Sequence, residues 1–136
     1  MILPRRILRF LGIDPSPGAR GERFAARHLK RQGYRILARN LRGRTGEIDI
    51  LAQAPDGRTI VVVEVKTSEG ALDARVAPEL RVGRDKQRKL AELAMEMTRR
   101  LRLTDRPVRF DVIGVSLMPD GKHQARHHPA AFESPW

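Results

Sequence analysis

Asp49, Glu64 and Lys66 are the residues of this chain whose types and spacing could do chemistry. Asp49 lies in the segment GEIDI, and the other two lie in the segment VEVK, with a Pro-Asp-Gly turn between the segments. An Asp-Gly pair flanked by alternating apolar residues is a strong β-hairpin signal. With Asp-Gly as the loop, Asp49 faces Glu64 across the hairpin, and opposed Cβ atoms lie about 4.5–5.5 Å apart on one face of the sheet. The sequence therefore predicts a carboxylate pair with an amine beside it.

Two carboxylates at this spacing share a proton, pair with cations or hold a metal ion. Oxygen ligands of this kind suit Mg²⁺ or Mn²⁺, which bind one or two carboxylates together with waters and substrate phosphates. The competing interpretation is structural: Glu47 faces Lys66 and forms a cross-strand salt bridge, while the two opposed acids point at water. The run Ile60–Val63 makes the strand before Glu64 apolar on both faces, so the charges end a buried strand. This pattern favours a cleft over a free surface.

Charge is distributed unevenly along the 136 residues, whose formal net charge is +11. Residues 1–46 carry twelve Lys/Arg against two Asp/Glu, residues 47–80 carry three against seven, and residues 81–109 carry ten against four. Basic flanks attract a polyanion, whereas an acidic centre needs a cation before phosphate can approach it. One Trp, one Tyr and four Phe give little support to a base-stacking platform for single strands. The absence of Cys excludes a disulfide framework, a thiolate metal site and a cysteine nucleophile.

The first helix is predicted over residues 17–32. Ser16 is a suitable N-cap, a proline follows it at the first helical position, and Gly33 is the expected C-terminal stop. Glu22 lies at the edge of the apolar stripe of this helix. It can serve either as a favourable acid near the helix N-terminus or as an acid directed toward the sheet, and the pattern leaves both interpretations open.

The remaining pattern predicts a second helix over residues 85–103 and several strands. Lys86 and Gln87 lie one turn before Leu90, so they face the same way as its core stripe, which we expect to run as far as Leu101. Residues 67–84 have no clear period and are predicted to form a long loop. The predicted strands are 34–41 (with Tyr34, Ile36 and Ala38 on one face), 47–53, 59–66, 108–116 and 121–128.

This order of elements predicts an α/β fold with a mixed sheet flanked by helices. The first three strands can form an antiparallel meander, and the second helix is long enough to be a crossover to a strand beside them. The length predicts one domain over residues 18–128, with a basic arm at 1–17 and a tail at 129–136. No apolar run approaches the length of a membrane span, and residues 1–17 are too broken for a signal peptide, so we expect a cytoplasmic location and no membrane partner.

The ordered set of motifs resembles the PD-(D/E)xK nuclease superfamily, whose restriction-endonuclease-like core has the order αβββαβ. More narrowly, the chain is similar to the bacterial YraN-like family, which is related to archaeal Holliday-junction resolvases. The stretches that carry the resemblance span most of residues 18–115 and are Gly21-Glu22 followed by Ala25, Gly33-Tyr34, Ala38-Arg39-Asn40, Gly46-Glu47-Ile48-Asp49, Val63-Glu64-Val65-Lys66-Thr67, Lys86-Gln87 and Arg109-Phe110-Asp111-Val112.

The resemblance implies Mg²⁺- or Mn²⁺-dependent cleavage of phosphodiester bonds in DNA, in branched or damaged structures. Asp49 and Glu64 would hold the metal, and Lys66 would orient or activate the attacking water. Glu22 would be an accessory metal ligand or an acid that contacts the metal ligands. Lys86 or Gln87 would contact phosphate or water near the scissile bond.

The proposed activity also carries expectations about the oligomeric state and about the basic side chains that contact nucleic acid. Cleavage of a Holliday junction needs two active sites, so that activity would require a homodimer. The alternative function is a non-catalytic nucleic-acid-binding or protein-interaction module on a nuclease-like fold. The side chains that we expect to contact nucleic acid are Lys86, Arg27, Arg31 and Arg44.

Overall fold

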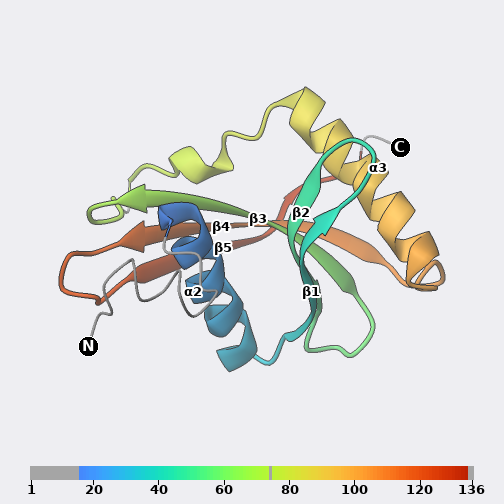
Figure 1. The fold of residues 1–136 in the computed structure, drawn as a ribbon, viewed down its shortest axis with the longest axis horizontal. Coiled ribbons are helices and arrows are strands. Elements are labelled where there is room, and N and C mark those ends of the chain that lie inside the picture. The colour runs from blue at the N-terminus through green and yellow to red at the C-terminus, as the bar shows by residue number, and fades with distance from the viewer. Residues whose placement is uncertain (1–15, 74, 135–136) are drawn as a thin grey trace.

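The chain folds into a five-stranded β-sheet with a helix packed against each face (Figure 1). The structure is a computed structural model that describes residues 16–73 and 75–134, so the predicted N-terminal arm lies outside the described residues except for its last two. The predicted α/β fold with a mixed sheet is confirmed, and it is consistent with a restriction-endonuclease-like core. The elements are α2 (Pro17–Arg31), β1 (Arg35–Arg42), β2 (Glu47–Gln53), β3 (Ile60–Glu69), the 3₁₀ turn η1 (Pro78–Leu80), α3 (Arg84–Arg100), β4 (Val108–Leu117) and β5 (Gln124–Phe132).

The strands lie in the order β1-β2-β3-β4-β5. β1, β2 and β3 form the predicted antiparallel meander, β4 is parallel to β3, and β5 is antiparallel to β4. A parallel neighbour requires a crossover connection, and the segment between β3 and β4 supplies it with η1 and α3. The β2–β3 pairing runs from Ile50 opposite Val63 to Gln53 opposite Ile60, which is the register predicted from the Asp-Gly turn.

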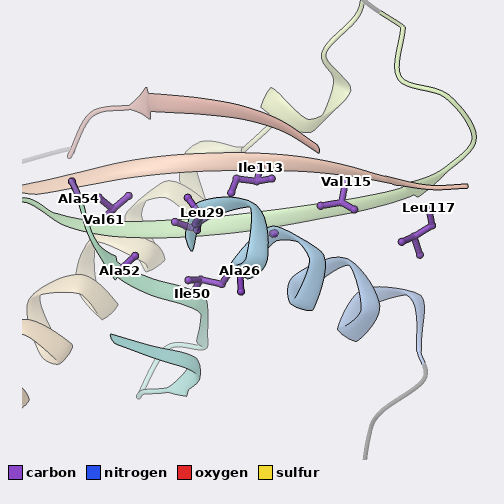
Figure 2. Packing of buried hydrophobic residues seen from close by; sticks show 11 residues of the cluster. Ala26, Leu29, Ile50, Ala52, Ala54, Val61, Ile113, Val115 and Leu117 are labelled. Atoms are coloured by element: carbon purple, nitrogen blue, oxygen red, sulfur yellow. The ribbon is translucent and has the colours of Figure 1, made fainter. Parts of the chain in front are cut away.

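Strand β3 is buried on both faces, which explains its unbroken apolar run. One face packs with α2 in a group that we call the α2-side core, and Figure 2 shows several of its side chains. The other face packs with α3 in the α3-side core. The buried members of the α2-side core include Ala25, Leu29, Ile50, Val61, Val63, Ile113 and Val115, and those of the α3-side core include Ile48, Leu51, Ile60, Val62, Leu90, Leu93, Met97 and Phe110.

Helix α2 begins where the sequence predicted and ends one residue earlier than predicted. The Ser16 hydroxyl accepts a hydrogen bond from the Ala19 amide at 3.2 Å, and proline occupies the first turn. Gln32 is the C-cap, and Gly33 follows with a φ of +90°, a left-handed conformation that glycine adopts without strain.

A β-bulge in β1 overturns the strict alternation predicted for residues 34–41. Ile36 pairs with Ala52 and Ala38 pairs with Leu51, so Leu37 is the additional residue on its strand. Tyr34 and Ile36 pack against the α2-side core as predicted, but Ala38 packs against the α3-side core. A bulge shifts every later side chain to the other face, so the prediction for Ala38 was wrong.

Two other predicted boundaries differ from the structure. Helix α3 ends at Arg100, and its C-cap Leu101 is 44% exposed, so the predicted core stripe ends at Met97. Leu103 packs against the α3-side core in its place. Strand β5 runs to Phe132, four residues past the predicted strand end at 128. Within the described residues, no helix is both long and apolar enough to span a membrane.

The extension of β5 depends on Asp111, which is fully buried in β4. Its carboxylate accepts hydrogen bonds from Arg109 at 2.8 and 2.9 Å, from the Ala130 amide at 2.9 Å, and contacts His127 Nε2 at 2.7 Å. Burial raises the pKa of Asp111, but these partners outweigh it and hold the pKa below its ordinary value. Arg109 also donates to the Tyr34 hydroxyl at 2.7 Å, so one buried acid ties β4 to the bulged part of β5 and to the residues after α2.

Gly21 marks a very close approach of α2 to the sheet. A Cβ at this position would lie 1.9 Å from Thr67 Oγ1 and 3.0 Å from Thr67 Cβ. We predict that Gly21→Ala lowers the free energy of unfolding by about 1–3 kcal/mol, because overpacking forces the helix or the strand to move. Urea denaturation followed by circular dichroism measures this change.

Gly18→Ala is the matched control, since nothing lies within 4 Å of a Cβ there. It removes a glycine from the same helix and should leave stability unchanged or raise it slightly. Adding Thr67→Ala to Gly21→Ala should restore part of the stability. Equal stability of the two alanine variants would show that this close approach does not limit helix docking.

Candidate functional site

The β2–β3 ladder ends at Asp49. Regular pairing extends as far as Ile50 opposite Val63, and continuing the same register would bring Val65 opposite Ile48. The Val65 amide instead donates to Asp49 Oδ2 at 2.8 Å. The carboxylate thus accepts the hydrogen bond that a backbone carbonyl would otherwise accept, and its orientation is fixed by the main chain of the neighbouring strand.

Strand β2 also twists at this point. Ile48 belongs to the α3-side core and Ile50 to the α2-side core, although residues two apart in a regular strand share a face. The change of side occurs across Asp49, where the strands separate. Continuing the observed register places Asp49 opposite Glu64, as predicted. The two residues face each other at an opening in the sheet, however, and not within a regular ladder.

Glu64 lies at the end of the buried part of β3 and is only 8% exposed. Its Oε2 atom is buried and has no hydrogen-bond partner within the part of the chain that the structure describes. Lys86 on α3 forms an ion pair with this atom, but its Nζ lies 3.8 Å away, too far for a hydrogen bond. A buried carboxylate oxygen without a donor is costly, and it is the kind of atom that a cation would satisfy.

Glu22 approaches the same opening from α2, and Asn40 of β1 connects it to β2. The Asn40 amide, in the orientation that satisfies its neighbours, donates to Glu22 Oε2 at 2.8 Å and to Glu47 Oε1 at 3.0 Å. Asn40 has a φ of +52°, a left-handed conformation that asparagine tolerates better than most residues. Glu47 also pairs with Arg42 at 3.6 Å. The Glu47–Lys66 salt bridge of the competing interpretation is not found in the described part of the chain, because the strands diverge before those residues meet.

The electrostatics join Glu22, Asp49 and Glu64 into one site. Burial raises the pKa of each carboxyl group above its ordinary value. The next cause for Glu22 and for Glu64 is the negative charge of Asp49, which also raises their pKa. The Val65 amide and Lys86 lower the pKa of Asp49, but burial outweighs them. Three acids from three elements therefore compete for too little positive charge.

Lys66 is half-buried on the same strand face as Glu64, and its charge lowers the pKa of both Asp49 and Glu64. Gln87 is not brought to the acids: its side chain donates to the Val82 carbonyl at 2.8 Å, at the start of α3. The guanidinium carbon of Arg27 lies 6.0 Å from the centre of the Phe24 ring, and both residues belong to α2.

Four arginines, together with Glu92 and Glu96, line a separate cleft of about 890 Å³ between the β1–β2 turn and α3. The turn is held to the helix because the Arg44 amide donates to Glu96 Oε1 at 3.0 Å. Gly43 permits this approach, since a Cβ there would lie 2.5 Å from Glu96 Oε2 and from a methyl group of Leu93. The arginines of this basic cleft are Arg42, Arg44, Arg99 and Arg100.

Sequence reasoning identified Arg44 of the basic cleft but missed Arg42, Arg99 and Arg100. Arg99 and Arg100 occupy the last turn of α3, where basic residues are common for their effect on the helix dipole, so the sequence carries no distinct signal for them. Asn40 belongs to one of the motifs that carry the family resemblance, but no role was predicted for it. Its one signal is its residue type, since asparagine is depleted in strands.

A metal ion at this site would be held by one or two protein carboxylates together with other ligands, and not by a complete cage of side chains. Within the residues that the structure describes, no three Asp, Glu or His side chains converge closely enough to form a metal cluster by themselves. Mg²⁺ characteristically binds one or two protein carboxylates and completes its coordination with waters and substrate phosphates. The donor-free Glu64 oxygen and the raised pKa of Asp49 agree with that arrangement.

Comparison with known proteins gives the family of the chain. The family model described as "Uncharacterised protein family UPF0102" matches residues 21–115. A UPF0102 protein of Pelobacter propionicus is 44% identical over 85% of this chain and 81% of its own length. A UPF0102 protein of Symbiobacterium thermophilum is 45% identical over 86% of this chain and 96% of its own length.

Among solved structures, Pyrococcus furiosus SfsA in complex with Ca²⁺ is 14% identical over 80% of this chain and 60% of that chain. Its TM-score of 0.35 is too low to support an argument about fold or site. The two UPF0102 relatives, by contrast, are 44% and 45% identical to this chain over most of its length and most of their own. The chain therefore belongs to the UPF0102 family, the YraN-like family that its motifs resemble.

Proposed function

We propose that this protein is a metal-dependent endonuclease that hydrolyses phosphodiester bonds in DNA. The observation that carries the proposal is the acidic opening at the end of the β2–β3 ladder, where Glu64 has a buried oxygen without a hydrogen-bond donor. Asp49 and Glu22 lie close enough to raise its pKa, and Lys66 lies beside it. The motif resemblance to PD-(D/E)xK nucleases supports the same function.

Asp49 and Glu64 would hold Mg²⁺ or Mn²⁺. When bound, such an ion acidifies water and stabilises negative charge on the phosphate oxygens. The Val65 amide keeps the Asp49 carboxylate in one orientation, so the ligand is positioned before the ion arrives. Lys66, two residues after Glu64 on the same strand face, would orient the attacking water and favour its deprotonation.

Glu22 would act through its neighbours rather than on the phosphate directly. Its carboxylate accepts a hydrogen bond from Asn40, and its charge raises the pKa of Glu64. It therefore adds negative potential at the site and increases the attraction for a divalent cation. Lys86 balances one of these charges through its 3.8 Å contact with Glu64, and it would be free to contact phosphate once a cation takes over that role.

The basic cleft supports DNA as the substrate. No hydrogen bond or ion pair is found for the guanidinium groups of Arg44 and Arg99 in the described part of the chain, so both remain available for phosphate. The neighbouring acid Glu96 is already engaged by the Arg44 amide and lies 4.0 Å from Arg100. The cleft lies at the turn that leads directly into β2, which carries Asp49.

Cleavage assays test the proposal directly. We predict that the purified protein with Mg²⁺ or Mn²⁺ cuts labelled branched DNA, and that Asp49→Ala and Lys66→Ala each reduce the rate by about 100-fold or more, because each removes a group that acts on the reacting phosphate or water. Gel analysis of junction, flap and single-stranded substrates measures this. Equal cleavage by wild type and both variants would identify a contaminating nuclease and contradict the assignment.

Stability gives an independent test of the metal site. In the metal-free protein, Glu64→Gln should raise the Tm at neutral pH by about 3–6 °C, the shift that about one kcal/mol gives in a chain of this size. The reason is that the folded state holds the Glu64 proton more tightly than the unfolded chain does. Its contribution to stability is complete below the ordinary pKa of 4.5 and is lost as the pH rises through the higher folded value, and the Gln variant should lack this pH dependence. Differential scanning calorimetry between pH 4 and pH 8 measures both effects.

Mn²⁺ should make the wild-type protein more stable than the Glu64→Gln variant, the reverse of the order expected without metal. At roughly a hundredfold excess over Kd, binding stabilises the wild-type fold by about 2.7 kcal/mol, and Asp49→Asn and Glu64→Gln should not show this stabilisation. Glu69→Gln, an exposed acid at the end of the same strand, is the control and should respond to Mn²⁺ as wild type does. Salt-dependent DNA affinity together with no metal response would instead support a non-catalytic binding module.

Charge reversal separates the basic cleft from the basic face of α2. We predict that Arg44→Glu with Arg99→Glu weakens DNA binding and reduces the slope of log affinity against log salt concentration by about one for each phosphate that the cleft no longer binds. Arg27→Glu with Arg31→Glu changes the net charge equally but lies on the outer face of α2. Fluorescence anisotropy at several salt concentrations measures both pairs. The same weakening in both would mean that net charge, and not the cleft, determines binding.

A further inference from the structure

A second pocket, of about 490 Å³, shares Lys66 with the acidic opening, and its other lining residues have no role in the proposed chemistry. It lies between the C-terminal end of β3, the loop before η1, and strands β4 and β5. Its volume is within the range of pockets that bind small molecules. We call it the β3 pocket, and it is lined by Lys66, Thr67, Ser68, Ala71, Leu72, Asp73, Val76, Pro78, Glu79, Gly114 and Arg126.

The loop wall of the β3 pocket is held in place by Arg126 of β5. Its guanidinium group donates to the Asp73 carbonyl at 2.6 Å and to the Val76 carbonyl at 2.6 Å, and it pairs with the Glu79 carboxylate. His128 Nε2 contacts the same carboxylate at 2.8 Å. These contacts give the long aperiodic segment after β3 a defined position against the sheet.

Glu79 and Gly114 form the floor of the β3 pocket. Glu79 is only 5% exposed, and a Cβ on Gly114 would lie 2.8 Å from its side chain, so the acid rests directly on the backbone of β4. Burial raises the pKa of Glu79, but the hydrogen bonds from Arg126 and His128 outweigh it and lower the pKa to about 2. The charges of this floor are therefore satisfied internally, and the ligand has to be recognised by the other walls.

Those other walls combine apolar surface with a hydroxyl group. Leu72, Val76 and Pro78 form the apolar side, and Ser68 supplies a hydroxyl group from β3. Enzymes that take a base out of its stack bind it between apolar or aromatic side chains and recognise its edge by hydrogen bonds. The walls of the β3 pocket offer both elements, apolar side chains and a hydroxyl group that can hydrogen-bond to a base edge.

Lys66 joins the β3 pocket to the acidic opening. It lines the pocket, and its charge acts on Asp49 and Glu64. Lys66 lies two residues beyond Glu64 on the same strand face, a separation of about 7 Å along the strand. A ligand in the pocket therefore lies beside a phosphate held at the two acids, as the sugar and base of an adjoining nucleotide would.

We propose that the β3 pocket takes one unstacked nucleoside of the DNA strand that is cut at the acidic opening. This inference rests on the proposed nuclease function and specifies its substrate: DNA with an unpaired nucleotide beside the scissile phosphate. Unstacking costs a few kcal/mol in paired DNA and least where the base is already unpaired. The pocket thus selects frayed, mismatched or branched DNA over a continuous duplex.

Binding in the absence of cleavage tests the pocket. The full chain carrying Asp49→Asn, without metal, is titrated into two hairpin duplexes of equal length, one fully paired and one with a single unpaired 2-aminopurine. We expect about tenfold tighter binding of the second duplex by fluorescence anisotropy, with a change in 2-aminopurine emission as the base leaves the stack.

Variants that fill the pocket should remove this preference. Val76→Trp and Ala71→Trp, each at the pocket wall, are expected to bring the two affinities within about twofold of each other. Leu80→Trp is the control, since Leu80 is 43% exposed on η1 and does not line the pocket. A preference that persists in both filled variants overturns the pocket assignment. Equal binding of both duplexes by the unfilled protein overturns it too but leaves the nuclease proposal standing, whereas no binding of either duplex at low salt contradicts the nuclease proposal itself.

Discussion

The structure depends on one constraint: β3 must be covered on both faces and paired with β2 up to Val63, and must lose its pairing with β2 beyond that residue. The covered part holds the two cores together, because α2 and α3 meet the sheet through it. The part without regular β2 pairing begins at Glu64, where β2 leaves the ladder and Asp49 accepts a hydrogen bond from the Val65 amide. The strand that makes the fold stable is therefore also the strand that presents charge, and the site cannot move without moving the cores.

The site makes an unfavourable electrostatic contribution to the stability of the metal-free fold. Three acids with raised pKa values and one orphaned carboxylate oxygen are unfavourable on their own. Within residues 16–73 and 75–134, the two other buried acids, Asp111 and Glu79, both have hydrogen-bond partners. The contrast is informative, since a fold that satisfies two deeply buried acids leaves a third unsatisfied only at the opening in its sheet. Incomplete satisfaction at functional positions is a general pattern in proteins.

Local signals in the sequence predicted most of the framework. The Asp-Gly turn determined the hairpin register, and Ser16 with Gly33 bounded α2, because each of these depends on residues close in the chain. The bulge at Leu37 and the extension of β5 could not be predicted in this way. Both depend on contacts with distant elements, such as the bond between Ala130 and Asp111, which leave no period in the sequence.

The site was predictable to the same extent. The register brought Asp49 and Glu64 together, and helical spacing left Glu22 with two interpretations, of which the structure has the one directed toward the sheet. The contact that connects Glu22 to β2 runs through Asn40, whose left-handed backbone no pattern indicates. Gln87 has a local partner instead, because its amide reaches the backbone at the start of its own helix.

Helix α3 has a further consequence as a spacer. It carries Lys86 beside the acids at one end and Arg99 beside the basic cleft at the other. The helical rise between these two residues is about 20 Å, at about 1.5 Å per residue. A strand of duplex DNA carries one phosphate per roughly 3.4 Å of axis, so this length corresponds to about six nucleotides. In the proposed nuclease, the helix would set a minimum length of flanking DNA, because a shorter arm could not occupy the cleft and the acids at the same time.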